Sequence, residues 1–600
     1  MFYPEKMSFV TIASSRDGLE PVIETLYGMK LLQIDEYVPQ EGIPLGSPLK
    51  GAEKVSDLLL DLHFIRSLAP WGPGRVEGIG LKEADQLIRK LKREVLGIKE
   101  RREAVGQKLR ESGKRQEGLE FLEAAGVQNA AALQSESLGV LAGFSESPAN
   151  TEALLKGRDC IMFWSKKLGK QYPVVVACPK AELDSFRPLM GLVPHALEGV
   201  ESRDVGRDLQ ALKGLIEKLR KEDESLGKAL RELGTEHGPV LRGAERLLRA
   251  RIRKAEAPLK CAVAEHSFLI AGWVPSRRIL SLRKGMERFR NLSLTVEEAE
   301  EGPTKLANPR GVKSFEFFLN LYSLPRLREI DPTFVVFLSF PIFYGMMLGD
   351  IGYGLVLYLL FSVLRWKLPK YRGLFDIFLL SSLSTMVFGY VFGEFFGAEE
   401  IMGIPLHPFI SRVHDVQELM FVSLMFGLVH LNLGFAFGFL NEFREHGLKK
   451  AVLTKASWVL LEFSGIFLVM DFFFGMPVID RLLGGALALA AIGMLFRGEG
   501  LVGLIEIPGL ISSVLSYLRL AAVGLASASL ALVANRMAGD LFASGGFLVV
   551  AGVLVLVLGH AMNIGIGLID AFLQSLRLHY VEMFTKFYRG SGKPYNPFGR

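Results

Sequence analysis

Hydrophobic residues are spread unevenly along this chain, and their pattern divides it near residue 330. Before that point short apolar runs alternate with long charged stretches, whereas after it long apolar runs follow one another closely. A helix that crosses a bilayer needs about 20 consecutive, mostly apolar residues. The pattern therefore predicts a soluble domain at 1–330 and an α-helical membrane domain at 331–600.

The apolar runs of the soluble domain predict small mixed units of helix and strand. Strand-like runs at 8–13 and 31–38 flank a stretch with helical spacing at 19–29. We therefore expect an α+β domain that contains two small α/β lobes. Further strand-like runs lie at 161–164, 172–177, 267–274 and 292–296, with a helix expected from Ser276.

Two long segments of the soluble domain have the spacing of a coiled-coil seam. Apolar residues recur every three or four positions through 84–109, where Arg102 is the one break, and through 205–233, where Asp223 is the break. Because a compact segment separates the two helices, we expect them to pair antiparallel as a rod. The predicted bounds are 80–122 with 203–255 for the coiled coil, 1–75 with 257–300 for one lobe and 125–200 for the other.

The membrane domain contains about eight apolar runs that we interpret as spans. The last two runs have 37 residues each. As single helices they would extend about 55 Å, well beyond a hydrocarbon core of about 30 Å, so we expect them to tilt steeply or to project. The predicted spans are 333–349, 351–365, 374–397, 416–440, 456–475, 481–497, 501–537 and 546–582.

The distribution of lysine and arginine between the loops predicts the topology. Basic residues concentrate in 365–372, in 444–455 and in the tail 586–600, which eight alternating spans place on the side of the soluble domain. The opposite loops at 398–415 and 537–545 contain few bases. Since basic loops stay in the cytoplasm, both termini are expected there.

Composition excludes several classes of protein. The net charge of +6 is small for 600 residues, and the bases are interleaved with glutamate, so we expect no nucleic-acid partner. The three cysteines, Cys160, Cys178 and Cys261, lack metal-ligand spacing. We expect no disulfide framework and a reducing cytoplasm around the soluble domain. The N-terminus lacks an apolar signal-peptide core, so no cleaved signal is expected.

The chain also lacks the motifs of common catalytic sites. It has no GxxxxGK[ST] phosphate loop, no GxSxG elbow and no cluster of metal ligands. We therefore expect a non-catalytic protein without a cofactor or a metal, which moves ions or anchors other proteins.

Two arginines stand inside the two longest apolar runs and mark the expected site. Arg519 lies in 501–537 and Arg577 in 546–582. An arginine at the centre of a membrane helix costs about 2.5–3.5 kcal/mol on insertion scales, so it usually faces protein or water and serves transport. Because arginine stays protonated, it can hold a passing carboxylate in its ionised form but cannot carry a proton itself. The structural alternative is an internal ion pair, in which Asp570 would be the partner of Arg577.

Other polar residues of the membrane domain predict two offset half-channels. Asp350 and Glu394 fall near the outer ends of their spans, whereas Glu462, Glu506 and His430 fall in the inner half. Each also has a structural interpretation: a carboxylate at a span end is often interfacial, and His430, like His560, suits an interhelical hydrogen bond.

Several motifs resemble subunit a of the vacuolar/archaeal-type rotary ATPases, called subunit I in prokaryotes. They occur in the order typical of that family and extend over the whole chain. The motifs are Phe268–Pro275 (FLIAGWVP), 329–333 (EIDPT), Phe343–Gly354 (FYGMMLGDIGYG), Gly389–Gly397 (GYVFGEFFG), Ser516–Leu520 (SYLRL), Ser575–Tyr580 (SLRLHY) and Lys586–Tyr588 (KFY).

The resemblance implies a stator subunit with defined partners. Its cytoplasmic domain would dock peripheral stalk subunits of the E/G type, and its last two helices would face a rotating ring of proteolipid c subunits, to which a central stalk subunit attaches. Arg519 would meet the carboxylate of the ring, with Arg577 beside it. Glu506 would lie on the cytoplasmic side, and Gln574 would line the same region.

This chain departs from the eukaryotic members at two positions. They have a histidine eight residues after the first arginine and a glutamate ten before the second, where this chain has Ser527 and Gly567. The outer half-channel therefore cannot be copied from them, and Asp570 or Glu394 is the expected substitute. The short length favours a multi-pass protein of a prokaryotic plasma membrane.

Two other functions remain to be compared with the stator. A stand-alone ion-coupled secondary transporter with a cytoplasmic regulatory rod predicts inverted repeats and helix breaks at a substrate site, which the sequence does not display. A purely structural membrane tether would leave both arginines unexplained. The sequence does not distinguish H⁺ from Na⁺, because the selecting carboxylate would belong to the ring.

Overall fold

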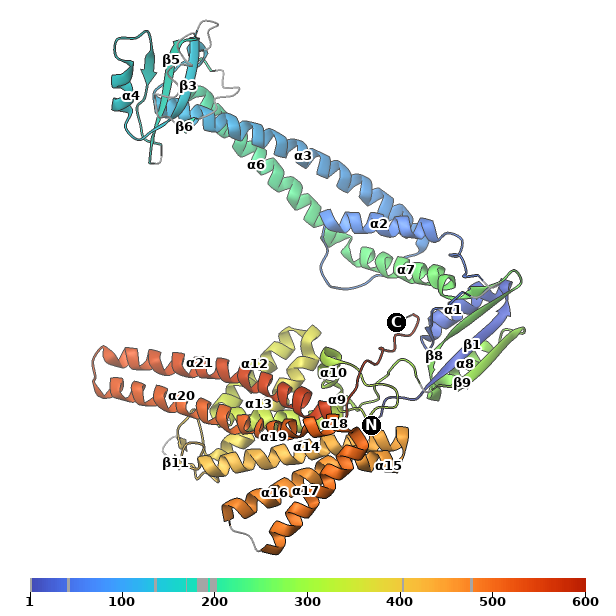
Figure 1. Cartoon of the computed structure of the whole chain (residues 1–600). Coiled ribbons are helices and arrows are strands. Elements are labelled where there is room, and N and C mark those ends of the chain that lie inside the picture. Colours follow the sequence, from blue (N-terminus) through green and yellow to red (C-terminus); the bar gives the residue numbers. More distant parts are fainter. Residues whose placement is uncertain are drawn as a thin grey trace. The chain divides into compact units, whose positions relative to one another are not determined.

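The computed structural model of the chain comprises two compact units (Figure 1), Met1–Gly46 with Leu259–Arg600 and Ser47–Pro258. The described residues are 3–39, 44–133, 138–168, 170–180, 193–194, 202–299, 301–401, 404–474 and 478–599.

The first unit contains an antiparallel sheet built from both ends of the soluble domain. The strand order is β2-β8-β1-β9, and the short β7 also pairs with β8. The second strand that the sequence predicted at 31–38 is only the two-residue β2, and it pairs with β8 and not with β1. The elements are β1 (Met7–Ser15), α1 (Leu19–Met29), β2 (Gln33–Ile34), β7 (Ala262–Val263), β8 (Ser267–Pro275), α8 (Ile279–Met286) and β9 (Leu292–Glu298).

The second unit is built on two long antiparallel helices, α3 (Leu81–Ala125) and α6 (Val205–Glu236). Their apolar faces join α2 (Ala52–Leu68) and α7 (Gly238–Glu256) in one core. The two residues that interrupt the predicted seams meet each other, with 2.8 Å between Arg102 Nε and Asp223 Oδ1.

The pairing of Arg102 with Asp223 explains both breaks in the apolar pattern. The hydrogen bond and the charge of Arg102 hold the pKa of Asp223 below its usual range. A second pair, Lys213 with Glu120 at 3.0 Å, also joins the two antiparallel helices. Both pairs are partly exposed, so each contributes at most about 1 kcal/mol of stability and mainly specifies which residues face each other.

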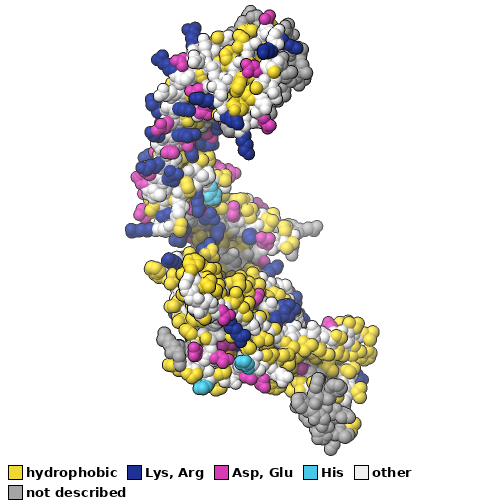
Figure 2. All heavy atoms as spheres, turned by 90° about the vertical axis from the view of Figure 1, so that its left-hand side faces the viewer, with side chains coloured by type: hydrophobic (Ala, Val, Ile, Leu, Met, Phe, Trp, Pro, Cys, Tyr) yellow, Lys and Arg dark blue, Asp and Glu magenta, His cyan; other side chains and the backbone are white. Residues whose placement is uncertain are grey.

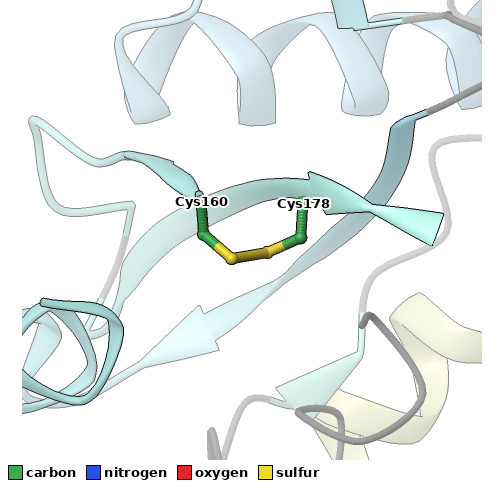
Figure 3. Close-up of a disulfide and its surroundings, with 2 residues drawn as sticks. All are labelled: Cys160 and Cys178. Carbon is green, nitrogen blue, oxygen red and sulfur yellow. A yellow bond between two sulfur atoms is a disulfide. The ribbon is translucent and has the colours of Figure 1, made fainter. Parts of the chain in front are cut away.

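A small four-stranded sheet lies at the other end of α3 and α6, with the order β4-β5-β3-β6. Here the structure corrects the expectation that no disulfide forms. Ile161 pairs with Ala177 in the antiparallel register of β4 and β5, so Cys160 lies opposite Cys178, and the two are bonded (Figure 3). Their separation of 18 positions has no periodic signature, and only the strand register brings them together. The elements are β3 (Leu138–Ser145), α4 (Pro148–Leu155), β4 (Ile161–Phe163), β5 (Tyr172–Pro179) and β6 (Val193–Pro194).

The third cysteine, Cys261, is buried and is not part of this disulfide. Burial raises the pKa of its thiol to about 12, so it behaves as a small apolar side chain.

The EIDPT motif begins the membrane domain and anchors the tail of the chain. The Glu329 carboxylate accepts the backbone N–H groups of Arg326, Arg589 and Gly590. Asp331 accepts the backbone N–H of Thr333 at 2.9 Å, at the start of α11. Burial raises the pKa of Asp331, although its hydrogen bonds oppose the shift. These buried carboxylates satisfy backbone donors that would otherwise lack partners.

The membrane domain is entirely helical apart from one short hairpin, within the part of the chain that the structure describes. Among these residues, six helical segments are long and apolar enough to cross a bilayer. The first two predicted spans are shorter helices, α11 and α12, of 16 and 17 residues, so the count of eight remains a prediction. Figure 2 shows hydrophobic side chains over much of this domain and mixed charges along α3 and α6.

The bounds of the remaining elements differ from the predicted runs mainly near the two arginines. The runs 501–537 and 546–582, which we expected to form single helices, are interrupted there. The elements are α9 (Arg310–Lys313), α10 (Glu316–Tyr322), α11 (Thr333–Leu348), α12 (Ile351–Lys367), α13 (Arg372–Phe392), β10 (Glu400–Ile401), β11 (Ile404–Pro405), α14 (Val416–His446), α15 (Leu448–Ala451), α16 (Ser457–Phe474), α17 (Val478–Glu499), α18 (Leu501–Ile505), α19 (Ile507–Leu515), α20 (Leu518–Ala543) and α21 (Leu548–Arg577).

Two helical glycines of the second unit provide a matched test of its packing. A Cβ on Gly243 of α7 would lie 1.8 Å from the Glu77 carbonyl oxygen, whereas a Cβ on Gly214 of α6 would meet nothing within 4 Å. We expect Gly243→Ala to destabilise this unit by about 1–3 kcal/mol. Gly214→Ala should stabilise it by about 0.5–1 kcal/mol, because alanine favours the helix. Hydrogen exchange of α6 and α7 in the purified full chain measures both, and equal effects would contradict the described packing.

Candidate functional site

Arg519 lies at a break in the first of the two long apolar runs. The run consists of α18, α19 and α20, which are separated at Glu506 and again at Ser516 and Tyr517. Arg519 is the second residue of α20. The N-terminus of a helix carries a partial positive charge, so a guanidinium at this position is stabilised only when an anion lies nearby.

Arg577 is the last residue of α21 and is followed by a π-helical turn, Leu578–Met583. In an α-helix, side chains five residues apart point about 140° away from each other. The i→i+5 bonding of a π-turn aligns them, which brings Glu582 to the side of Arg577. The Nε of Arg577 lies 3.9 Å from Glu582 Oε1. The expected partner, Asp570, is half-buried and forms no ion pair with any described residue.

Glu582 joins the two arginines into one site. Its carboxylate is buried and lies within electrostatic range of both Arg519 and Arg577. Glu582 was not predicted as a site residue, because the pattern around it indicated a regular α-helix. In such a helix the side chains of Glu582 and Arg577 would point in different directions. The sequence contained no signal for the π-turn.

Each arginine lies at the end of a stripe of exposed residues on its helix; Arg577 is itself exposed, whereas Arg519 is half-buried. On α21 the exposed residues Met562, Ile566, Ile569 and Leu573 follow one another at helical spacing and lead to Arg577, which is 48% exposed. On α20 the exposed positions continue from Arg519 through small residues to larger ones, namely Ala522, Ala526, Ser529, Leu530, Val533 and Met537. α20 and α21 pack side by side along their length (Figure 1), so the two stripes lie on neighbouring helices, and we call them together the α20–α21 surface.

Several polar atoms around the arginines have no partner among the described residues. The Nε of Arg519 is buried and has no hydrogen-bond partner among the described residues. Gln574, one turn before Arg577, has a buried Oε1 without a donor, and so does Glu582 at Oε2. A buried polar atom without a partner costs about 1–3 kcal/mol. The site therefore has unused hydrogen-bonding capacity.

A third arginine, Arg412, shows the opposite arrangement. It is 1% exposed, and its guanidinium forms a bidentate pair with Glu394, with 2.8 Å between Nε and Oε1. Its Nη1 also donates to the Gly524 carbonyl at 3.2 Å. Arg412 lies in the loop before α14, outside the apolar runs, and for this reason it was not among the predicted site residues. Its charge is fully balanced inside the chain.

Glu394 and Asp350, the two predicted outer half-channel residues, both make strong internal interactions. Glu394 is the counter-ion of Arg412. Asp350 caps α12 by accepting the N–H of Tyr353 at 2.9 Å, and it also accepts the N–H groups of Phe396 and Gly397. The GDIGYG and GYVFGEFFG segments pack closely, which requires glycine: a Cβ on Gly389 would lie 2.3 Å from the backbone nitrogen of Ile351.

The predicted inner residues lie on several elements around Lys586. Glu462 of α16 is buried and accepts a hydrogen bond from Asn432 at 3.0 Å. Glu506 is exposed at the break between α18 and α19. Both lie within electrostatic range of Lys586, as does Glu582. A cavity of about 310 Å³ opens at Lys586 and is lined mostly by charged residues.

His430, the remaining predicted site residue, lies in a buried cluster. It is 3% exposed, and its Nδ1 lies 2.8 Å from the hydroxyl of Tyr517. The interhelical hydrogen bond that was its alternative interpretation is therefore present. His560 also forms one, with 2.7 Å between its Nδ1 and the hydroxyl of Tyr353.

Comparison with known proteins shows which proteins this chain is similar to. The model of the V-type ATPase 116 kDa subunit family matches residues 257–378 and 505–599. A-type ATP synthase subunit I of Archaeoglobus fulgidus is 29% identical to the chain, and the match covers 100% of this chain and 99% of that protein. The subunit I of Halobacterium salinarum has the same identity and coverage. The chain is therefore similar to A-type ATP synthase subunit I over its whole length. The resemblance that the motifs indicated is confirmed.

Two further matches are partial. Subunit I of Pyrococcus horikoshii is 31% identical over 56% of this chain and 54% of that protein. Among solved structures, the cytoplasmic N-terminal domain of a V-ATPase subunit I is 18% identical, with a TM-score of 0.29, over 48% of this chain and 99% of that domain.

The match to the family model includes both arginines but leaves out some of the other predicted site residues. Residues 505–599 contain both arginines and Glu582. The ion pair of Arg412 and Glu394 lies outside the matched ranges, as do His430 and Glu462.

The contrast between Arg412 and Arg519 predicts different effects on stability. Arg412→Gln leaves the Glu394 carboxylate buried without a counter-ion, which should destabilise the purified chain by about 3–5 kcal/mol. Arg519→Gln removes a guanidinium whose Nε has no hydrogen-bond partner among the described residues, and it should change stability by less than about 0.5 kcal/mol. Thermal unfolding in detergent compares the two. The double variant Arg412→Met with Glu394→Leu should recover most of the loss; failure to do so would refute the role of the pair.

Proposed function

We propose that this chain is the membrane stator subunit of an A/V-type rotary ATPase, in which it forms two ion half-channels against a rotating proteolipid ring. Ions enter one half-channel, bind to a carboxylate of the ring, travel through nearly a full rotation and leave by the other. ATP synthesis or hydrolysis takes place on other subunits, so this chain is not itself catalytic.

The observation that carries the proposal is the unbalanced charge of the α20–α21 surface. The Nε of Arg519 has no hydrogen-bond partner among the described residues, and the half-exposed guanidinium of Arg577 lies 3.9 Å from one oxygen of Glu582. A lipid-facing arginine is expensive, whereas an arginine facing a carboxylate is favourable. The surface thus suits a partner helix that is apolar except for one acidic residue.

The chemical role of Arg519 in this proposal is to keep the ring carboxylate ionised between the two half-channels. An opposite charge within about 4–6 Å lowers the pKa of a carboxyl group by about 1–3 units in a low-dielectric site. The ring carboxylate would therefore release its proton beside Arg519 and could not pass in the protonated form. The small residues Ala522 and Ala526 next to Arg519 allow a partner helix to approach closely.

The charged cavity at Lys586 suits the cytoplasmic half-channel. Its 310 Å³ hold several waters, and Glu506, Glu462 and Glu582 provide acceptors between the cavity and the arginines. For the outer half-channel we propose Asp570, because Asp350 and Glu394 are engaged in internal contacts. Gln574 would contribute its unpaired Oε1 beside the ring.

The remaining partners follow from the same assignment. The c-ring would pack on α20 and α21, a central stalk subunit would attach to the ring, and peripheral stalk subunits of the E/G type would dock on the soluble domain. The domain of 1–330 would lie in the cytoplasm, with both termini, and the chain would be a multi-pass protein of a prokaryotic plasma membrane. The rival, a stand-alone secondary transporter, needs no other subunits.

Replacing Arg519 tests the proposed function directly. In the complete complex, Arg519→Gln should abolish ATP-driven ion translocation, because the ring carboxylate can then pass in its neutral form. Complex assembly should be unchanged. Translocation is measured by acidification of proteoliposomes, or by sodium uptake if the ring carries Na⁺. Arg536→Gln, on the exposed side of the same helix, is the matched control and should retain translocation. Normal translocation in Arg519→Gln would overturn the assignment.

Purification from the native membrane separates the stator from the transporter. A stator extracted in mild detergent should bring stoichiometric ATPase subunits and a proteolipid ring, which mass spectrometry identifies. A chain that is isolated alone and still catalyses ion-coupled solute uptake in liposomes would support the transporter instead.

A further inference from the structure

Each arginine of the site has a buried aromatic neighbour two residues away in the sequence. Tyr517 precedes Arg519 by two positions, and His579 follows Arg577 by two. Both side chains are fully buried, whereas Arg519 is half-buried and Arg577 is exposed. Each neighbour therefore connects its arginine to the interior of the membrane domain.

Tyr517 connects the start of α20 to α14. Its hydroxyl lies 2.8 Å from His430 Nδ1, and its ring packs on Gly427, where a Cβ would come within 2.5 Å of the ring. Position 427 must be glycine for this contact to form. Tyr517 lies at the break between α19 and α20, so its position depends on these contacts more than on helix hydrogen bonds.

His579 connects the π-turn to α11. Its Nδ1 lies 2.6 Å from the Ser575 carbonyl and therefore carries a proton, and its Nε2 lies 2.6 Å from the Ser339 hydroxyl. A ring that donated through both nitrogens would be a cation buried among phenylalanines. In the neutral ring, Nε2 accepts a hydrogen bond from the Ser339 hydroxyl. That hydroxyl then no longer donates to the Val335 carbonyl, its other neighbour.

The two histidines meet each other. Their ring centroids are 4.8 Å apart in an edge-to-face arrangement, and Phe343 of α11 packs against both, at 4.9 Å from His430 and 5.5 Å from His579. A continuous buried cluster thus runs from Ser339 through His579 and His430 to Tyr517. It joins α11, α14, the start of α20 and the π-turn.

We propose that this cluster of Ser339, His579, His430 and Tyr517 is a positioning element that holds Arg519 and Arg577 at a fixed separation while the partner carboxylate passes. The proposal rests on the proposed function and assigns to it residues that bear on the arginines only indirectly. Both arginines lie next to irregular backbone, the break before α20 and the π-turn after α21, where regular helix hydrogen bonds do not fix side-chain positions. A displacement of about 1 Å in a charge-stabilising group can cost orders of magnitude in rate.

A second tyrosine–histidine pair in the same domain provides a matched control. The hydroxyl of Tyr353 in α12 lies 2.7 Å from His560 Nδ1 of α21, and Tyr353 is as buried as Tyr517. Tyr353 also accepts a hydrogen bond from Asn563. Neither Tyr353 nor His560 lies next to an arginine in the sequence. Removal of either tyrosine hydroxyl deletes the same kind of buried contact.

The test compares Tyr517→Phe with Tyr353→Phe in the complete complex, and its readout is the number of ions moved per ATP hydrolysed. This ratio does not depend on how much complex assembles, so a merely structural role would not change it. We expect Tyr517→Phe to lower the ratio at least about fivefold, the factor that corresponds to one neutral hydrogen bond. Tyr353→Phe should leave it unchanged. Equal ratios in the two variants would overturn the proposal.

Two substitutions of His430 keep the proposal testable if Tyr517→Phe does not assemble. His430→Gln keeps a group that can hydrogen-bond to the Tyr517 hydroxyl, so it should retain most of the ratio of ions moved to ATP hydrolysed. His430→Leu should lower this ratio as Tyr517→Phe does. Identical ratios for glutamine and leucine would contradict a positioning role. Arg519→Gln is measured alongside: if it translocates normally, the proposed function fails, and if it is blocked while Tyr517→Phe behaves like Tyr353→Phe, only the positioning role fails.

Discussion

A guanidinium among apolar helices must have a counter-charge, and the organisation of this membrane domain depends on where each counter-charge comes from. Arg412 obtains it inside the chain, from Glu394, in a bidentate pair that also ties the loop before α14 to α20 through the Gly524 carbonyl. Arg519 and Arg577 share a single buried acid, Glu582, which is too distant to balance either of them fully. One arginine therefore stabilises the fold, and the other two leave an unbalanced positive charge on an apolar surface. That difference carries the proposed function, because only a partner with a carboxylate makes such a surface favourable.

The irregular backbone at this surface has a physical consequence. A continuous helix would direct Glu582 away from Arg577, and it would give Arg519 no special position along the run. The break at Ser516 and Tyr517 and the π-turn after Arg577 bring the charged groups together, but they also remove the regular hydrogen bonds that normally hold a helix in place. Buried contacts from α11 and α14 take over that role. The rigidity of the site is thus supplied by packing between helices and not by the helices that carry the arginines.

Much of the fold could be predicted from residue patterns because those patterns are local. The 3/4 spacing of α3 and α6, the apolar runs and the two costly arginines all follow from periodicity or from the expense of a charge in a membrane. The interactions between distant residues could not be predicted in this way. The breaks at Arg102 and Asp223 looked like two separate defects, and they are one ion pair. Cys160 and Cys178 looked unpaired until the register of β4 and β5 placed them opposite each other. Glu582 looked like an ordinary helical glutamate until the π-turn moved it.

The sequence by itself therefore determined the division into a charged and an apolar domain and the family resemblance, and it predicted the two arginines as the centre of the candidate site. It could do so because hydrophobicity, motif order and the cost of an isolated charge are properties of the chain. Only the tertiary structure decided which arginine has its charge balanced inside the chain. For Arg412 this depends on a glutamate 18 residues away, and for Arg577 it depends on a π-helical turn. It also decided that Asp350, Glu394 and His430 each have an internal partner. The sequence sets which residues are charged, but the packing of the helices decides which of them form pairs.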